Sequence, residues 1–244
     1  RMSTDPATTG PAPPDPATNP VRPAPASTDP AHPDPALLLM QWLSPAYPVG
    51  AFAYSHGLEG AVEAGMVTTG ATLSDWLADL LSHGGARSDA QLLACAYRAD
   101  TQDDLAEIDS IARAFCPSAE RLRETDLQGA AFCQTTAGIW GDDLAALAYP
   151  VAVGHAARCH GIPLGLTLQM YLQAFVSNLI AAGQRLLSLG QLEAQQRLAA
   201  LTCEIQDTAK AALAGDLDDL QGATFAADIA SMRHETQYSR IFRS

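Results

Sequence analysis

Residues 163–190, PLGLTLQMYLQAFVSNLIAAGQRLLSLG, form a long apolar segment from which the expected architecture follows. A proline opens the segment, a glycine closes it, and apolar side chains occupy almost every face of the helix between them. Such a helix is either central in its own fold or covered on a second side by another subunit. The stretch therefore predicts a core helix in a helical protein, and it raises the expectation of a homodimer.

Helical signals continue in both directions from this segment. Asp34 and Pro35 are suited to cap and begin a short helix over ALLLMQWL, which Pro45 and Pro48 end. Further helices are predicted over 54–65, from Thr72 with Asp75 completing an approximate capping box, from Ser88 after Gly84 and Gly85, and over 103–115, 118–140, 149–161 and 192–214. No alternating strand pattern follows residue 35. The sequence thus predicts an all-α single domain of about eight to ten packed helices over residues 36–244.

Residues 1–35 have a different composition from the rest of the chain. They hold most of the 16 prolines, a loose DPAT, DPAT, DPAH, DPAL recurrence and few large apolar side chains. Such a segment buries too little surface to offset its chain entropy. We therefore predict a disordered Pro/Ala-rich extension in front of the domain.

Charge and cysteine usage narrow the class of partner and the compartment. The 244 residues carry a net charge of -13, which disfavours binding to nucleic-acid phosphates. The five cysteines are far apart in apolar surroundings and predict reduced core thiols, not a disulfide framework. No leader pattern opens the chain, and apolar runs such as LAALAYPVAVGHAA fall short of a membrane span. We expect a cytoplasmic protein with no membrane partner.

Two blocks near the ends of the predicted domain stand out from the alanine- and leucine-rich sequence between them. The first, WLSPAYPVGAFAYSHGLE at 42–59, combines prolines that fix backbone angles with glycines that allow unusual ones, so it predicts a loop with a preset shape. The second closes the sequence as DIASMRHETQYSRIFRS at 228–244, where arginines alternate with apolar anchors. Arginine beside aromatic residues is favoured at the centres of protein interfaces. The alternative for the second block is a last helix folded back on its own core.

These two blocks resemble the UreF family of urease accessory proteins. Weaker agreement lies in SAERLRETDLQG and YPVAVGHAARCHGIPL, so the resemblance covers about residues 36–244 and leaves out the proline-rich extension. The resemblance implies an all-helical, dimeric, non-enzymatic protein without a cofactor. It also implies that UreD (UreH) and the UreG GTPase are partners in delivering nickel to apo-urease, with this subunit as scaffold and modulator of the GTPase.

The resemblance further implies which residues bind the partner. The C-terminal segment, about 225–244, supplies Met232, Arg233, His234, Glu235, Tyr238, Arg240, Phe242 and Arg243. The early block supplies Pro48, Gly50, Tyr54, Ser55, His56, Gly57 and Glu59.

An enzyme or a metal-binding protein is the alternative from another class. Ser55 with His56 could suggest a nucleophile and base, but the stretch is no GxSxG elbow, and adjacent helical residues point apart. His155 and Cys159 share a helix face and could supply two metal ligands, which do not close a site, while His160 points elsewhere.

A helical transcription regulator is the third possibility, which the acidic charge disfavours. The sequence has no GK[ST] after a glycine-rich stretch, so any GTP chemistry must come from a partner. The acidic run at Asp216, Asp218 and Asp219 is expected to be a solvated loop.

Overall fold

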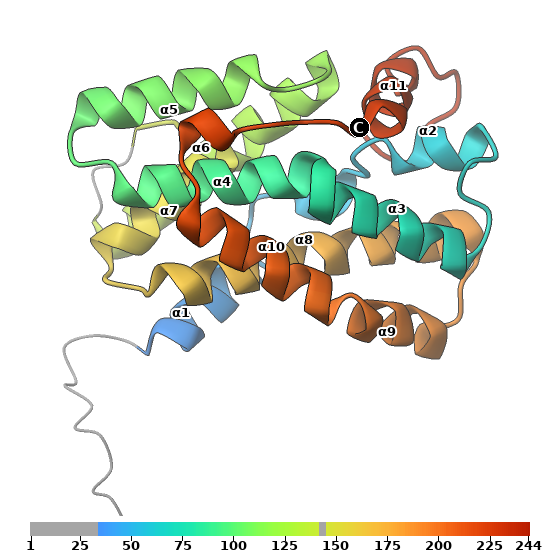
Figure 1. The fold of residues 1–244 in the computed structure, drawn as a ribbon, viewed down its shortest axis with the longest axis horizontal. Coiled ribbons are helices and arrows are strands. Elements are labelled where there is room, and N and C mark those ends of the chain that lie inside the picture. Colours follow the sequence, from blue (N-terminus) through green and yellow to red (C-terminus); the bar gives the residue numbers. More distant parts are fainter. Residues whose placement is uncertain (1–33, 142–144) are drawn as a thin grey trace, which may run out of the picture. The chain divides into compact units, whose positions relative to one another are not determined.

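The computed structural model of the chain describes residues 34–141 and 145–244 (Figure 1), and every regular element within them is a helix. In chain order the elements are α1 Pro35–Trp42, the 3₁₀ turn η1 Ala51–Ala53, α2 Leu58–Glu63, α3 Gly70–His83, α4 Gly85–Arg98, α5 Gln102–Ala114, α6 Ala119–Trp140, α7 Tyr149–Cys159, α8 Leu164–Leu187, α9 Gln191–Ala200, α10 Thr202–Ala214, the 3₁₀ turn η2 Leu217–Asp219, and α11 Phe225–His234. The all-helical prediction is confirmed. The expected disorder of the proline-rich extension falls almost wholly outside the described residues.

Helix α8 lies at the centre of the described fold, as its apolar sequence predicts. It packs against α10, α4, α9, α2, α3, α7 and α1, so neighbours within the same chain cover most of its faces. We expected no apolar run long enough to span a membrane. This was wrong for α8, because its 24 residues meet the test for a membrane-spanning helix by length and composition alone. A buried core helix passes the same test, and the packing of α8 on seven other helices accounts for its composition.

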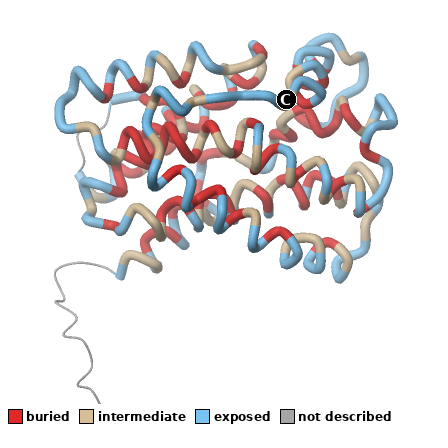
Figure 2. Tube along the Cα trace, in the orientation of Figure 1, coloured by how far each residue is buried: buried red, intermediate tan, exposed pale blue. Residues whose placement is uncertain are grey.

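Helices α4 and α7 form the tightest pair in the core. A Cβ added at Gly154 of α7 would overlap the carbonyl oxygen of Leu93 in α4, so the two backbones are in close contact at this point. Small buried residues along both helices, such as Ala90 and Ala156, keep the pair close. Figure 2 shows the buried residues concentrated along these helices. The alanine-rich composition therefore serves close helix packing.

An aromatic cluster fixes the start of the domain to α6. The buried ring of Trp42 lies edge-on to Phe132, Trp140 and His160, with centroids 5.4, 5.8 and 5.3 Å away. The hydroxyl of Tyr47 lies 2.9 Å from that of Thr136, within hydrogen-bonding distance. Because these contacts anchor both ends of residues 42–47, the following loop begins from a fixed position.

Several helix boundaries differ from the predicted ones. Thr69, not Thr72, is the N-cap of α3, because the two threonines form a reciprocal capping box. Helix α4 begins at Gly85, and the hydroxyl of Ser88 donates to the carbonyls of Gly84 and Gln221 instead of capping. The predicted helix over 192–214 is two helices, separated where the N–H of Leu201 bonds the carbonyl of Leu198 in a tighter turn.

The early block contains a longer irregular segment than predicted. Helix α2 begins at Leu58, not at residue 54, because His56 and Gly57 both adopt the left-handed backbone region, with φ of 52° and 77°.

Asp34 and Pro35 begin α1 as predicted, with the Asp34 carboxylate accepting the N–H of Ala36 at 2.8 Å.

Candidate docking site

The two blocks at the ends of the domain lie against each other. Helix α2 packs on α11, and a Cβ added at Gly57 would lie 2.9 Å from the backbone nitrogen of Ser231. A Cβ at Gly60 would lie 2.8 Å from the carbonyl oxygen of Ala230. Glycine is needed at 57 for its backbone conformation as well, since a positive φ strains other residues. The glycines of the early block thus let the last helix approach closely.

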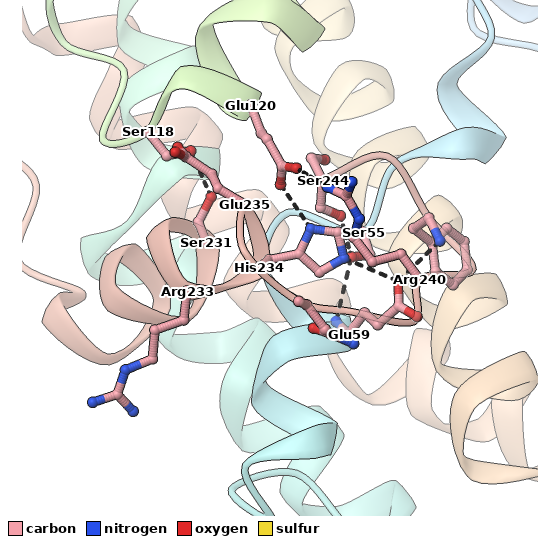
Figure 3. A network of polar contacts seen from close by, with 12 residues as sticks. Ser55, Glu59, Ser118, Glu120, Ser231, Arg233, His234, Glu235, Arg240 and Ser244 are labelled. Atoms are coloured by element: carbon pink, nitrogen blue, oxygen red, sulfur yellow. Dashed lines mark hydrogen bonds and ion pairs between the residues drawn. The ribbon is translucent and has the colours of Figure 1, made fainter.

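A group of charged side chains joins α2, α6 and the end of the chain (Figure 3), and we call Glu59, Glu120, His234 and Arg240 the polar clamp. Glu59 of α2 is buried, and its two carboxylate oxygens accept the backbone N–H groups of Ile241 at 2.7 Å and Phe242 at 2.9 Å. A carboxylate that receives main-chain donors fixes the path of the segment that supplies them.

His234 connects the two carboxylates of the polar clamp. Its ring is fully buried, with Nδ1 2.7 Å from Oε2 of Glu120 and Nε2 3.0 Å from Oε2 of Glu59. The second oxygen of Glu120 accepts from the Arg240 guanidinium at 2.7 Å. Arg240 reaches this position from the chain segment that follows α11, so the clamp ties that segment to α6.

Further hydrogen bonds hold the last residues along the early loop. The backbone N–H of Ser55 donates to the carbonyl oxygen of Ser244 at 2.9 Å, and its hydroxyl donates to the same oxygen. The N–H of Arg243 donates to the carbonyl of Ala53 at 2.8 Å. Phe242 is buried, and the Arg185 guanidinium lies 5.6 Å from the centre of its ring. The end of the chain is therefore part of the folded core.

A second group of buried charges lies next to the polar clamp and is centred on Glu124 of α6. This carboxylate receives His56 at 2.9 Å, Arg121 at 2.7 Å, Gln128 at 2.8 Å and the hydroxyl of Ser244 at 2.8 Å. Burial alone would raise the pKa of Glu124, but the charges of Arg121 and His56 outweigh it and lower that pKa to about 2. Glu124 is thus ionised and fully hydrogen-bonded in the core.

A cavity of about 270 Å³ lies beneath the early loop, between α6 and α8. Aromatic residues such as Tyr149 and Phe175 form its walls, and Asp89 and Arg121 lie at its charged end. Burial raises the pKa of Asp89, although Arg121 and His56 oppose the shift. The carboxylate of Asp89 accepts the Tyr171 hydroxyl at 3.0 Å.

The predicted site residues separate into an exposed and a buried set. Exposed are Pro48, Met232, Arg233, Glu235, Tyr238, Arg240 and Arg243. Buried are Tyr54, Ser55, Gly57, Glu59, His234 and Phe242, while Gly50 and His56 are half-buried. The structure thus brings the two blocks together, and it shows the alternative that we considered for the second block, a last helix folded back on its own core. The buried set can act on a partner only by positioning the exposed set.

The C-terminal part of the exposed set combines apolar side chains with arginines. Met232, Tyr238 and Ile241 are exposed there, together with Phe225 and Ile229 on the same closing segment. Arg233 points away from the clamp into solvent (Figure 3). We call the residues between 225 and 243 whose side chains are exposed the closing surface.

Sequence reasoning missed the residues that α6 contributes. Glu120, Arg121 and Glu124 lie in SAERLRETDLQG, which we noted only as a weaker block. The signal that could have identified them is polar residues at helical spacing on both faces, because Arg121, Glu124 and Gln128 are buried. Polar side chains on the buried face of a helix must find partners elsewhere in the chain.

The geometry does not support the enzyme or metal alternatives. The hydroxyl of Ser55 is occupied by Ser244 and by the N–H of Glu59, and His56 faces Glu124 instead. Nε2 of His155 lies 3.7 Å from Sγ of Cys159, but the described residues contain no group of three or more His, Cys, Asp or Glu that could hold a metal ion. The His160 ring packs edge-on against the ring of Trp42.

The fold and the clamp together define a class of protein: an all-helical protein in which buried charged side chains join the two ends of the domain. The model of the UreF family matches residues 67–202, between the two end blocks. A urease accessory protein UreF from Ruegeria sp. (strain TM1040) is 74% identical over 208 residues, covering 85% of this chain and 97% of the relative.

Two further relatives carry the same description. The one from Ruegeria pomeroyi (strain ATCC 700808 / DSM 15171 / DSS-3) is 52% identical over 208 residues, 85% of this chain and 96% of the relative. The one from Rhodopseudomonas palustris (strain HaA2) is 53% identical over 218 residues, 84% of this chain and 92% of the relative. The chain belongs to the UreF family of urease accessory proteins, which are not enzymes.

Proposed function

We propose that this protein is the scaffold of a cytoplasmic complex that inserts nickel into apo-urease. In this proposal the closing surface and the early loop together bind UreD (UreH), and the composite surface of the two proteins recruits the UreG GTPase and modulates it. The observation that supports the proposal is a set of exposed apolar side chains on a segment whose backbone is held by Glu59 of the polar clamp. Fixing a binding segment before the partner arrives lowers the ordering cost of association.

The chemistry of this surface fits a protein partner. Met232, Tyr238 and Ile241 offer apolar anchors, while Arg233 and Arg243 supply positive charge on a chain whose net charge is -13. Aromatic and arginine residues dominate the energetics of protein interfaces. The partner surface should therefore be an apolar groove bordered by carboxylates. Nucleotide hydrolysis belongs to UreG in this proposal, since the sequence carries no GK[ST] motif.

Co-purification with UreD tests the proposal directly. We expect the double variant Tyr238→Ser/Ile241→Ser to lose at least about tenfold in affinity for UreD, because both exposed anchors are removed. Helical circular dichroism should not change, since neither side chain is buried. The matched control is Leu192→Ser, which removes an equally exposed apolar side chain from α9. UreD retention at the level of the control would overturn the proposal.

The proposed homodimer has a separate test. Helix α8 does not require a second subunit, since its own chain covers most of it, so this part of the proposal depends on the family alone. Sedimentation at micromolar concentration should give a dimer. A monomer under those conditions would remove the dimer and leave the UreD proposal standing.

A further inference from the structure

The cavity beneath the early loop reaches from the surface into the domain. Phe52, Ser177 and Arg185 line it and are exposed, whereas Trp42 and Glu124 line it and are fully buried. A small molecule can therefore enter from solvent and reach the interior. Benzene fills a protein cavity of about 150 Å³. The volume of about 270 Å³ here thus admits a ligand of one ring with a short polar group.

Aromatic side chains form much of the cavity wall. Trp42, Phe52, Tyr149, Tyr171 and Phe175 line it, and the rings of Tyr149 and Tyr171 lie 5.7 Å apart. The faces of aromatic rings attract cations, and the attraction is stronger where water is excluded. A wall of this composition therefore suits an apolar ligand or an organic cation better than a strongly hydrated anion.

Two polar groups of the wall have hydrogen-bonding capacity that other residues do not use. Oδ2 of Asp89 accepts the Tyr171 hydroxyl at 3.0 Å and lies 3.8 Å from the Arg121 guanidinium. The other carboxylate oxygen, Oδ1, has no hydrogen bond within the described part of the chain. Nε1 of Trp42 is buried and has no acceptor among the same residues. Since buried polar groups nearly always have partners, an unused acceptor and an unused donor at one cavity point to a polar ligand.

The charges at the inner end of the cavity leave Asp89 with the weaker compensation. Arg121 lies 2.7 Å from Glu124 but 3.8 Å from Asp89, and His56 contacts Glu124 as well, at 2.9 Å. Arg185 also lines the cavity, but it lies at the exposed mouth and makes no ion pair with Asp89 in the described structure. Burial raises the pKa of Asp89 although Arg121 and His56 oppose the shift. A further cation would therefore stabilise the ionised form of this carboxylate.

We propose that this cavity binds a small organic cation, whose ammonium group donates to Oδ1 of Asp89 and whose apolar body lies against the aromatic wall. An anion would instead meet the two carboxylates of Asp89 and Glu124 at the same end. A neutral apolar molecule would fill the space but supply neither the charge nor the hydrogen that an ammonium group brings. The site lies within one chain, so this inference does not depend on the proposed function.

Three probes of similar size and different charge test the proposal on the wild-type chain: benzylammonium, benzyl alcohol and benzoate. Binding is followed by NMR through the indole N–H signals of Trp42, which lines the cavity, and of Trp76 on α3, which serves as the internal control. We expect benzylammonium to shift the Trp42 signal and to bind at least about tenfold more tightly than benzyl alcohol, while benzoate does not bind.

The same titrations can overturn the proposal without any variant. Equal affinity for benzylammonium and benzyl alcohol, or a preference for benzoate, would show that the cavity does not select a cation. No shift of the Trp42 signal at about 10 mM benzylammonium would show that the cavity does not bind one.

A variant without the charge assigns the binding to Asp89. Asp89→Asn should lose at least about tenfold in affinity for benzylammonium and keep its affinity for benzyl alcohol, because asparagine still accepts the Tyr171 hydroxyl but carries no charge. The matched control, Asp79→Asn, removes an exposed carboxylate from α3 and should bind as wild type. It corrects for the general attraction of cations to a chain with a net charge of -13. Wild-type affinity for benzylammonium in a folded Asp89→Asn protein would refute the proposal.

Discussion

The backbone N–H of Ser55 donates to the carbonyl oxygen of Ser244 at 2.9 Å and joins residues 189 positions apart. The hydroxyl of Ser55 donates to the same oxygen and also accepts the N–H of Glu59. One serine thus contacts both the first turn of α2 and the last residue of the chain.

Replacing that serine should affect both tasks. We expect Ser55→Ala to lower the free energy of unfolding by about 1–2 kcal/mol, because a buried hydroxyl with two partners is lost. Urea titration measures the change. Ser110→Ala, which removes an exposed hydroxyl bonded within α5, should stay within about 0.5 kcal/mol of wild type. Equal effects of the two substitutions would contradict the assigned role of Ser55.

Two glycines of α6 should respond oppositely to the same substitution. A Cβ at Gly129 would overlap the carbonyl oxygen of Leu147, whereas a Cβ at Gly138 meets nothing within 4 Å. Gly129→Ala should therefore destabilise the protein by several kcal/mol or prevent folding, since backbone must move. Gly138→Ala should stabilise it by about 0.5–1 kcal/mol. Thermal unfolding of the two variants measures both changes. A stable Gly129→Ala protein would refute the close approach of Leu147 to α6.

Glu124 should make the protein sensitive to acid. Its folded-state pKa is lowered from 4.5 to about 2, so its ionised form stabilises the fold above about pH 4.5, and this contribution is lost as the pH falls toward 2. The shift corresponds to roughly 3 kcal/mol. Urea titrations from about pH 7 to about pH 3 should show the loss in wild type and in Glu107→Gln, an exposed control.

The Glu124→Gln variant separates this residue from other acids. It leaves Arg121 buried with a weakened partner, so we expect about 3–5 kcal/mol of destabilisation at neutral pH and a flatter acid profile. A profile as steep as that of wild type would show that another carboxylate is responsible.

The cysteines should divide by reactivity. Cys159 and Cys203 are exposed, whereas Cys95 and Cys133 are buried and burial raises the pKa of both thiols. Burial also raises the pKa of Cys116, to about 11. Since the thiolate is the reactive form, an aromatic disulfide reagent at neutral pH should modify Cys159 and Cys203 first and the other three only on unfolding. Rapid modification of Cys133 in the native protein would contradict the packing of α6.

The helices could be predicted because their start signals are local in sequence. The polar clamp could not, because its residues are far apart in sequence. Asp34 and Ser118 each mark the start of a helix, because their side chains accept a backbone N–H from the first turn that follows. We predicted the wrong cap for α3 because Thr69 and Thr72 are the same residue type, and either could serve as an N-cap. The structure was needed to show that Thr69 is the N-cap.

The clamp lies beyond such local reasoning. Glu59, Glu120 and His234 come from three helices, and the contacts of His234 with the two glutamates span 175 and 114 positions. Sequence patterns mark Glu59 and His234 as members of unusual blocks, but they cannot state that the side chains meet, because nothing local depends on it. We predicted contact with a partner for Glu59 and His234, and the structure shows that these two residues also contact each other.

The pairing of residue 59 with residues 241 and 242 has a consequence for synthesis. The ribosome releases α2 early, and the donors that complete its carboxylate emerge almost a whole domain later. A chain that stops before residue 241 lacks both donors to Glu59 and therefore cannot complete the closing surface. If the proposed partner binds the closing surface, it would bind only molecules whose translation has passed residue 242, and unfinished chains would not enter the complex.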